Sequence, residues 1–167
     1  RRISSAASDV YKRQNIEGIP ELRQSIVEKF KKDNDLNYDV SNVIVGTGGK
    51  QILFNALMSS LNKDDEVIIP APYWVSYPDM TLLAGGKPIF VDCSSETNFK
   101  LTGKALDKVI TKNSKWLILN SPSNPTGSCY SLSELEEIAN VVRKHENLYV
   151  MTDDIYEYIV YDNFKFY

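Results

Sequence analysis

The chain has 167 residues, 43% of them hydrophobic and 25% charged, which fits one globular α/β domain and argues against a disordered protein. Its net charge of -3 argues against nucleic acid as a partner, because binding a polyanion through a general basic surface needs clustered Lys and Arg. Its apolar runs are far shorter than the ~20 residues of a membrane helix, so no membrane partner is expected.

Residues 1–14 form a leader that combines small and charged side chains without the apolar core of a signal peptide. They also lack the periodicity of the sequence that follows. Two interpretations stay open: the leader is disordered, or it is foreign to the native protein. We expect residues 15–167 to form part of a single domain.

The first elements are predicted from spacing and glycines. Apolar residues recur at helical spacing from Pro20, which predicts a helix to about Lys32. A β-branched run at residues 43–45 predicts a short strand that ends in a glycine turn. A second helix is expected from about Lys50 to Asn62.

The alternation of strands and helices continues to the end of the chain. Strands are predicted at residues 67–69, 88–91, 116–119 and 148–151, and helices at about 75–84, 102–110 and 131–144. Ser131 and Glu134 form a capping-box pattern at the last helix. Apolar strands that alternate with helices predict an α/β fold, a mostly parallel sheet with helices on both faces. Two strand-like aromatic runs, 158–161 and 164–167, suggest that the chain stops inside a larger fold.

Four unusual segments follow predicted strands, where ligands gather in parallel sheets. They are residues 46–50, 72–74, 124–127 and 153–156. The glycines of the first suit a phosphate at a helix N-terminus, or simply a tight connection between strand and helix. Trp74 in the second suits stacking on a flat aromatic cofactor, or packing at the rim of the core.

The last two segments carry the polar candidates. Asp153 follows an apolar strand, where a carboxylate needs a cation, a metal or strong donors, such as a protonated ring nitrogen. It also suits the N-cap of a following helix. Asn124 suits a donor to a phenolate-type oxygen, with Tyr156 as a second donor, although its surroundings also have the sequence of a plain surface turn.

Taken together, these segments resemble the class I aminotransferases of pyridoxal 5'-phosphate (PLP) fold type I, and within them the bacterial aspartate/prephenate aminotransferases. The resemblance spans residues 18–167 and rests on Gly18-Ile19-Pro20-Glu21-Leu22-Arg23, Gly48-Gly49-Lys50-Gln51, Ala71-Pro72-Tyr73-Trp74-Val75-Ser76-Tyr77-Pro78, Asn120-Ser121-Pro122-Ser123-Asn124-Pro125-Thr126-Gly127 and Asp153-Asp154-Ile155-Tyr156-Glu157. It implies an incomplete large domain of such an enzyme.

The resemblance implies a role for each candidate residue. Backbone N–H groups of Gly48, Gly49 and Lys50 would bind the PLP phosphate. Trp74 would stack on the ring, and Asp153 would pair with its protonated nitrogen. Asn124 and Tyr156 would bond the 3'-oxygen, and the substrate-binding residues would be Lys50, Trp74 and Asn124. Lys50 is associated with dicarboxylic substrates, which implies aspartate or glutamate with 2-oxoglutarate, although a solvated lysine at a helix start is the alternative.

Some features depart from the family pattern. Asp154 stands where the family usually has Glu, and Arg13 where it has a Tyr that reaches the phosphate of the partner subunit. The lysine that binds the cofactor covalently and the arginine that binds the α-carboxylate lie beyond the equivalent of Tyr167. We therefore expect this polypeptide alone to be inactive, and the full-length enzyme to be a homodimer.

Other functions remain open on the sequence alone. Related PLP enzymes act as aromatic or alanine aminotransferases or as C–S lyases, and a non-catalytic PLP-fold regulator is a further alternative. No metal site is expected, because Cys93 and Cys129 match no metal or redox spacing. Such cysteines are ordinary in a reducing compartment, so a cytoplasmic location is predicted.

Overall fold

The computed structural model describes residues 15–167, and the predictions for residues 1–14 lie outside this range. The chain divides into two compact units, one up to Ile52 and one from Leu53 to Tyr167. Each unit is described by itself. No helix within residues 15–167 combines the length and apolar character needed to cross a membrane.

The first unit contains helix α2 (Pro20–Asn34), the 3-10 turn η1 (Val40–Asn42) and the start of α3 (Gly49–Ser60). The predicted helix from Pro20 is confirmed, with Pro at its first position. Arg23 links α2 to the segment that follows it. Its guanidinium donates hydrogen bonds to the Val43 carbonyl at 2.9 Å and to the Val40 carbonyl at 2.6 Å.

The strand predicted at residues 43–45 is wrong, since these residues form no strand in the described chain. The Val45 N–H donates to the Glu17 carbonyl at 2.9 Å, which is a single bond and not a ladder. A β-branched run favours an extended backbone, but a strand also needs a neighbour to pair with.

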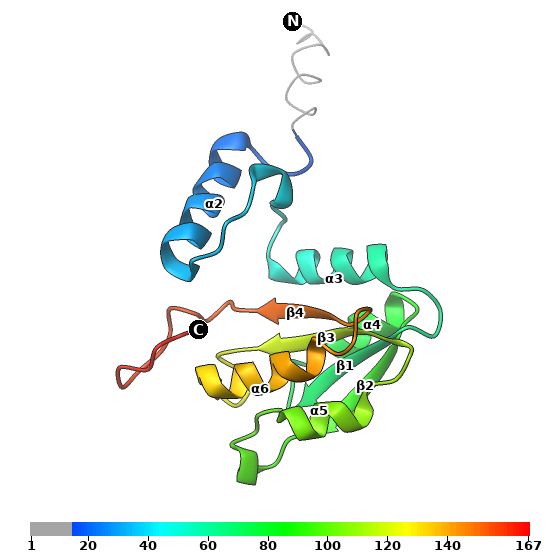
Figure 1. Cartoon of the computed structure of the whole chain (residues 1–167). Helices are drawn as coiled ribbons and strands as arrows, with labels where there is room; N and C mark the ends of the chain where they lie inside the picture. Colours follow the sequence, from blue (N-terminus) through cyan, green and yellow to red (C-terminus); the bar gives the residue numbers. More distant parts are fainter. Residues whose placement is uncertain (1–14) are drawn as a thin grey trace, which may run out of the picture. The chain divides into compact units, whose positions relative to one another are not determined.

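The second unit contains a four-stranded parallel sheet in the order β2-β1-β3-β4 (Figure 1). The strands are β1 (Glu66–Ala71), β2 (Lys87–Asp92), β3 (Ser114–Asn120) and β4 (Tyr149–Asp153), and the helices between them are α4 (Ser76–Leu83), α5 (Gly103–Val109) and α6 (Leu132–Val142), with the 3-10 turn η2 (Ser95–Thr97) before α5. Four predicted strands and three predicted helices are thereby confirmed, with bounds that differ by one or two residues.

Alternate residues of the strands point to opposite faces of the sheet and build two separate cores. Ile68 and Leu117 pack with side chains of α5 and α6 on one face. Val67, Ile69 and Ile118 pack on the other face with side chains of α4 and of the part of α3 after Ile52. Figure 1 shows α5 and α6 together on one side of the sheet. The predicted α/β architecture, with helices on both faces of a parallel sheet, is confirmed.

The end of the chain differs from expectation. Residues 158–161 and 164–167 form turns and irregular backbone, not strands. The Ile159 N–H donates to the Tyr156 carbonyl and the Phe164 N–H to the Tyr161 carbonyl, as in consecutive tight turns. Aromatic side chains favour strands only where they pack against neighbours, and Tyr158 and Tyr161 are 69% and 76% exposed.

Candidate functional site

The carboxyl ends of the strands bring three of the four candidate segments to one edge of the sheet. Asn120 and Asp153 are register partners at the ends of β3 and β4. The segment with Trp74 follows the last residue of β1, Ala71, and the segment with Asn124 follows β3. This is the edge where open parallel sheets bind ligands.

Asp153 is held by a tyrosine from a distant part of the chain. The Tyr77 hydroxyl donates to Asp153 Oδ2 at 2.7 Å. Tyr77 lies on α4 and is only 2% exposed. Burial raises the pKa of Tyr77 well above its ordinary range, and the hydrogen bond to Asp153 and its charge add to this effect, so the phenol keeps its proton and remains a donor.

The carboxylate of Asp153 retains the capacity to accept another hydrogen bond. Tyr77 is the one donor to this side chain within residues 15–167, although a carboxylate accepts several bonds. Turns follow β4, so Asp153 caps no helix in the described chain, and the N-cap interpretation is wrong. The site therefore presents a half-buried acid that a cationic ligand would satisfy.

Asn120 links the two strand ends to the next loop. Its side-chain amide donates to the Asp153 carbonyl at 2.7 Å, and its side-chain oxygen accepts from the Asn124 N–H at 2.7 Å. The peptide bonds before Pro122 and Pro125 in this loop are cis. Asn124 is half-buried, and no group within residues 15–167 bonds its side-chain amide. The turn predicted here is present, and its amide is available to a ligand.

Trp74 and Tyr156 lie near the same tyrosine. The Trp74 ring meets Tyr77 edge to face, with ring centroids 5.4 Å apart and planes at 84°. Trp74 is half-buried against the core on the α4 face, as the packing interpretation expected. Tyr156 is close enough to act electrostatically on the Tyr77 hydroxyl, as are Asp153 and Asp154. Within this unit, the structure thus brings Trp74, Asp153 and Tyr156 around one buried phenol.

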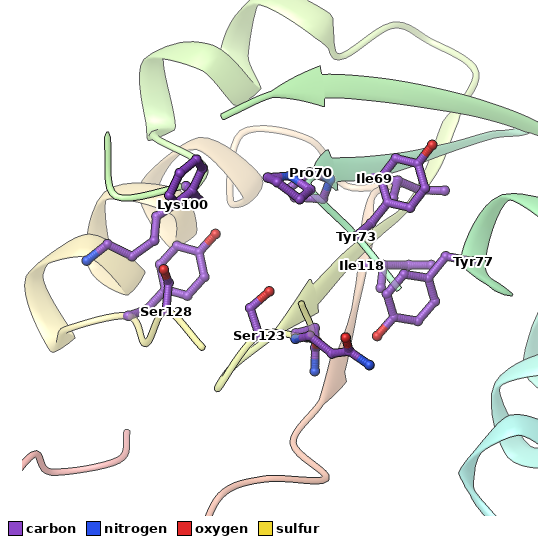
Figure 2. Close-up of a pocket in the computed structure, with 13 residues that line it drawn as sticks. Ile69, Pro70, Tyr73, Tyr77, Lys100, Ile118, Ser123 and Ser128 are labelled. Carbon is purple, nitrogen blue, oxygen red and sulfur yellow. The ribbon is translucent and has the colours of Figure 1, made fainter. Parts of the chain in front are cut away.

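A recess opens beside these residues (Figure 2). Figure 2 shows Tyr73 and Tyr77 on one side of the recess and Lys100 and Ser128 on the other, with Ser123 between them. The Lys100 ammonium forms an ion pair with Glu134. Phe99 and Tyr130 also line the recess, so aromatic side chains surround its polar groups. The described residues contain no cluster of three or more side chains suited to a metal ion.

The glycine turn belongs to the first unit and is exposed. Gly48 has a φ of +88°, which favours glycine, and its N–H donates to the Gly46 carbonyl at 3.0 Å. Gly49 and Lys50 begin α3, and the first N–H groups of a helix have no acceptor inside it. A Cβ added at Gly48 or Gly49 would meet no atom within 4 Å, so the space beside the turn is open.

Two residues that organise the site, Tyr77 and Asn120, were not among the predicted candidates. Asn120 is a polar residue at the end of an apolar strand, the same signal that pointed to Asp153. Tyr77 carries no comparable signal, because its partner lies 76 positions away.

Comparisons with known proteins show the family of the chain. The family model "Aminotransferase class I and II" matches residues 2–167. A probable aspartate/prephenate aminotransferase from Rickettsia bellii is 62% identical over 153 residues, which are 92% of this chain and 38% of that protein.

Two solved structures are similar over nearly the whole chain. The crystal structure of the aspartate aminotransferase from Rhizobium meliloti has a TM-score of 0.90 and 44% identity, over 97% of this chain and 42% of that one. The aromatic aminotransferase from Pyrococcus horikoshii OT3 has a TM-score of 0.89 and 39% identity, over 92% and 41% of the two chains. The chain thus spans about two fifths of the length of these proteins. It belongs to the class I and II aminotransferase family, in the aspartate/prephenate aminotransferase branch.

Proposed function

We propose that the full-length protein containing this chain is a PLP-dependent aminotransferase that moves an amino group between aspartate or glutamate and a 2-oxo acid. The single observation that carries the proposal is the Asp153 carboxylate, which lies at the carboxyl end of a parallel strand with one donor from the described chain. Membership of the aminotransferase family supports the same activity.

The chemistry of the donor set fits PLP. A carboxylate with unused acceptor capacity suits a protonated ring nitrogen, and side-chain amide and phenol donors suit a phenolate oxygen. Asp153 supplies the first, while Asn124 and Tyr156 supply the second. When bound, PLP withdraws electrons from the α-carbon of the amino acid through its positive ring. The task of Asp153 is to keep that ring nitrogen protonated.

The remaining candidate residues bind and orient. Gly48, Gly49 and Lys50 would bind the cofactor phosphate with backbone N–H groups at the start of α3. The Trp74 indole would stack on the ring and limit its tilt. The Asn124 amide would also bind the substrate α-carboxylate, which fixes the substrate beside the cofactor.

Lys50 would select the substrate. Its ammonium is a flexible point charge, which suits the side-chain carboxylate of aspartate, glutamate or a related dicarboxylate. The name of the Rickettsia bellii relative suggests prephenate as a further amino-group acceptor. An aromatic aminotransferase is the second candidate, because the aromatic enzyme from Pyrococcus horikoshii matches the fold almost as well as the aspartate enzyme does.

The full-length protein would supply what residues 15–167 do not. We propose that this stretch is part of the large domain, and that a lysine and an arginine beyond the equivalent of Tyr167 bind the cofactor covalently and the α-carboxylate. We also propose a homodimer, as the family resemblance implies. The 167-residue chain alone is accordingly expected to show no transamination with aspartate and 2-oxoglutarate.

The test uses the full-length protein with PLP and measures kcat/KM for aspartate, alanine and phenylalanine with 2-oxoglutarate. Aspartate is expected to be the best substrate. Lys50→Ala should lower kcat/KM for aspartate by about 10-fold, the scale of one charge-assisted hydrogen bond. It should leave the value for alanine unchanged, since alanine has no side-chain carboxylate.

The matched control is Lys63→Ala, another lysine on the chain that carries no proposed role. It should leave all three substrates unaffected. Equal losses for aspartate and alanine in Lys50→Ala would contradict the substrate role of Lys50. A preference for phenylalanine would favour the aromatic candidate, and absence of any PLP binding would reject the proposed function as a whole.

A further inference from the structure

We propose that Tyr77 is a positioning residue that fixes the carboxylate of Asp153 in the orientation needed to pair with the cofactor. The inference rests on the proposed function, because it concerns how Asp153 meets PLP. It stands on the geometry of a single contact, in which the Tyr77 hydroxyl donates to Asp153 Oδ2 at 2.7 Å.

The phenol is held rigidly on its own side. Tyr77 is 2% exposed and belongs to the core on the α4 face of the sheet. Its backbone N–H donates to the Trp74 carbonyl at 3.1 Å, and its carbonyl accepts from the hydroxyl of the fully buried Thr81 at 2.9 Å. The Trp74 ring packs against it edge to face. The hydroxyl therefore has little freedom to move away from Asp153.

The direction of the hydrogen bond is also fixed. An ionised carboxylate only accepts, so the tyrosine must donate. Burial, and then the hydrogen bond and charge of Asp153, raise the pKa of Tyr77, so the phenol is a donor at neutral pH. Tyr77 thus holds Oδ2 in place, and Oδ1 has no donor from the described residues and is the oxygen more open to the cofactor. A carboxylate that is free to rotate would lose entropy each time it formed that pair.

The chain offers a matched control for the loss of a buried phenol hydroxyl. Tyr130 is 5% exposed, and its hydroxyl accepts from the Leu101 N–H at 2.8 Å. It packs in the core on the opposite face of the sheet. Tyr77→Phe and Tyr130→Phe thus remove the same group from comparable surroundings, but only one of these groups contacts Asp153.

The experiment measures the PLP dissociation constant of the full-length protein by equilibrium dialysis. Tyr77→Phe is expected to weaken PLP binding about five-fold, the worth of one ordinary hydrogen bond. Tyr130→Phe should stay within about two-fold of the unsubstituted protein, the usual scatter for independent sites. The unfolding midpoints of both variants are measured alongside to compare their folding.

A double-mutant cycle with Asp153→Ala separates positioning from packing. If Tyr77 acts through Asp153, adding Tyr77→Phe to Asp153→Ala should change the PLP dissociation constant by less than about two-fold. A five-fold effect in both backgrounds would overturn the proposal, because packing does not depend on the carboxylate. No effect of Tyr77→Phe in the unsubstituted protein would overturn it as well. Failure of the unsubstituted protein to bind PLP would instead reject the proposed function.

A second measurement does not require Tyr77→Phe to fold. In protein labelled with 13C at the tyrosine ring carbon that bears the hydroxyl, Asp153→Ala should shift the Tyr77 resonance and leave that of Tyr130 in place. The same comparison in the absence of PLP tests whether the contact exists before the cofactor binds. Unchanged tyrosine resonances in Asp153→Ala would overturn the proposal independently of any activity.

Discussion

Two carboxylates at opposite ends of the sheet are treated differently by the fold. Glu66 is the first residue of β1 and is 6% exposed. It accepts from the Thr111 hydroxyl at 2.6 Å and from the Ser114 hydroxyl at 3.2 Å. Asp153 is the last residue of β4 and is half-buried, and its carboxylate accepts from the Tyr77 hydroxyl alone within the described chain.

This difference in bonding and position indicates that the two acids have different roles. Glu66 is deeper and better bonded, and both of its partners are neutral hydroxyls on the chain that leads into β3. It therefore joins elements of the fold. Asp153 is partly open at the end where ligands bind, and its hydrogen bonding is incomplete. We infer that Glu66, whose Oε2 accepts two hydroxyl bonds at the end of the sheet away from the candidate site, is structural, whereas Asp153 at the ligand-binding end is suited to a ligand.

The largest expected effect is that of Asp153→Asn in the full-length protein. The amide keeps the size of the side chain and can still accept from Tyr77, but it loses the charge that holds a ring nitrogen protonated. We expect kcat/KM for aspartate to fall by about 10³-fold, as when a preorganised electrostatic group is removed. The unfolding midpoint should stay close to that of the unsubstituted protein. Steady-state kinetics beside a urea titration give both values.

The same change from acid to amide at Glu66, at the other end of the sheet, should lower stability and leave activity unchanged. Glu66→Gln weakens two hydrogen bonds to a charged acceptor, which lowers the free energy of unfolding by about 1 kcal/mol. Activity per folded molecule should not change. A large loss of kcat/KM in Glu66→Gln, with stability intact, would contradict the division between a structural and a ligand-binding acid.

The smallest effect concerns a third carboxylate, Glu134, at the start of α6. It caps the helix through Ser131 and forms an ion pair with Lys100. Burial raises the pKa of Glu134, but Lys100 and Ser131 outweigh burial, so the pKa lies below the ordinary value of 4.5. Its contribution to stability is therefore full above the unfolded-state pKa and is lost as pH falls through the folded-state value.

Glu134→Gln should accordingly lower stability at pH 7 by less than about 1 kcal/mol, as is usual for pairs near the surface. The difference from the unsubstituted protein should shrink towards zero in acid. Urea titrations at pH 7, 5 and 3 measure it, and Lys100→Gln is the matched partner variant. A difference that grows as pH falls would contradict the assigned role.

Local patterns explain which elements could be predicted from the sequence. The capping box of Ser131 and Glu134 forms as expected, because both partners lie within one helical turn. The apolar strands β1 and β3 also form where predicted, since burial on both faces requires continuous apolar runs. Residues 43–45 have the same β-branched character, but the single bond from Val45 to Glu17 cannot take the place of a paired strand.

The candidate site was predictable in part for the same reason. Asp153 stood out because a charge after an apolar strand needs a partner, and its position at the sheet edge agrees with that expectation. The identity of its partner was not predictable, because nothing in the sequence around Tyr77 distinguishes it from other aromatic residues that pack in a core from a short helix. A contact between residues 76 positions apart depends on how α4 packs on the sheet.

The bridging amide of Asn120 has a consequence for engineering. One side chain bonds the backbone of Asp153 and the backbone of Asn124, so it connects the acid to the loop. Transplanting the acid alone onto another parallel sheet would lose this connection and leave the loop to find its own position. A designer who wishes to reuse the arrangement would have to graft the asparagine, the acid and the loop as one cassette.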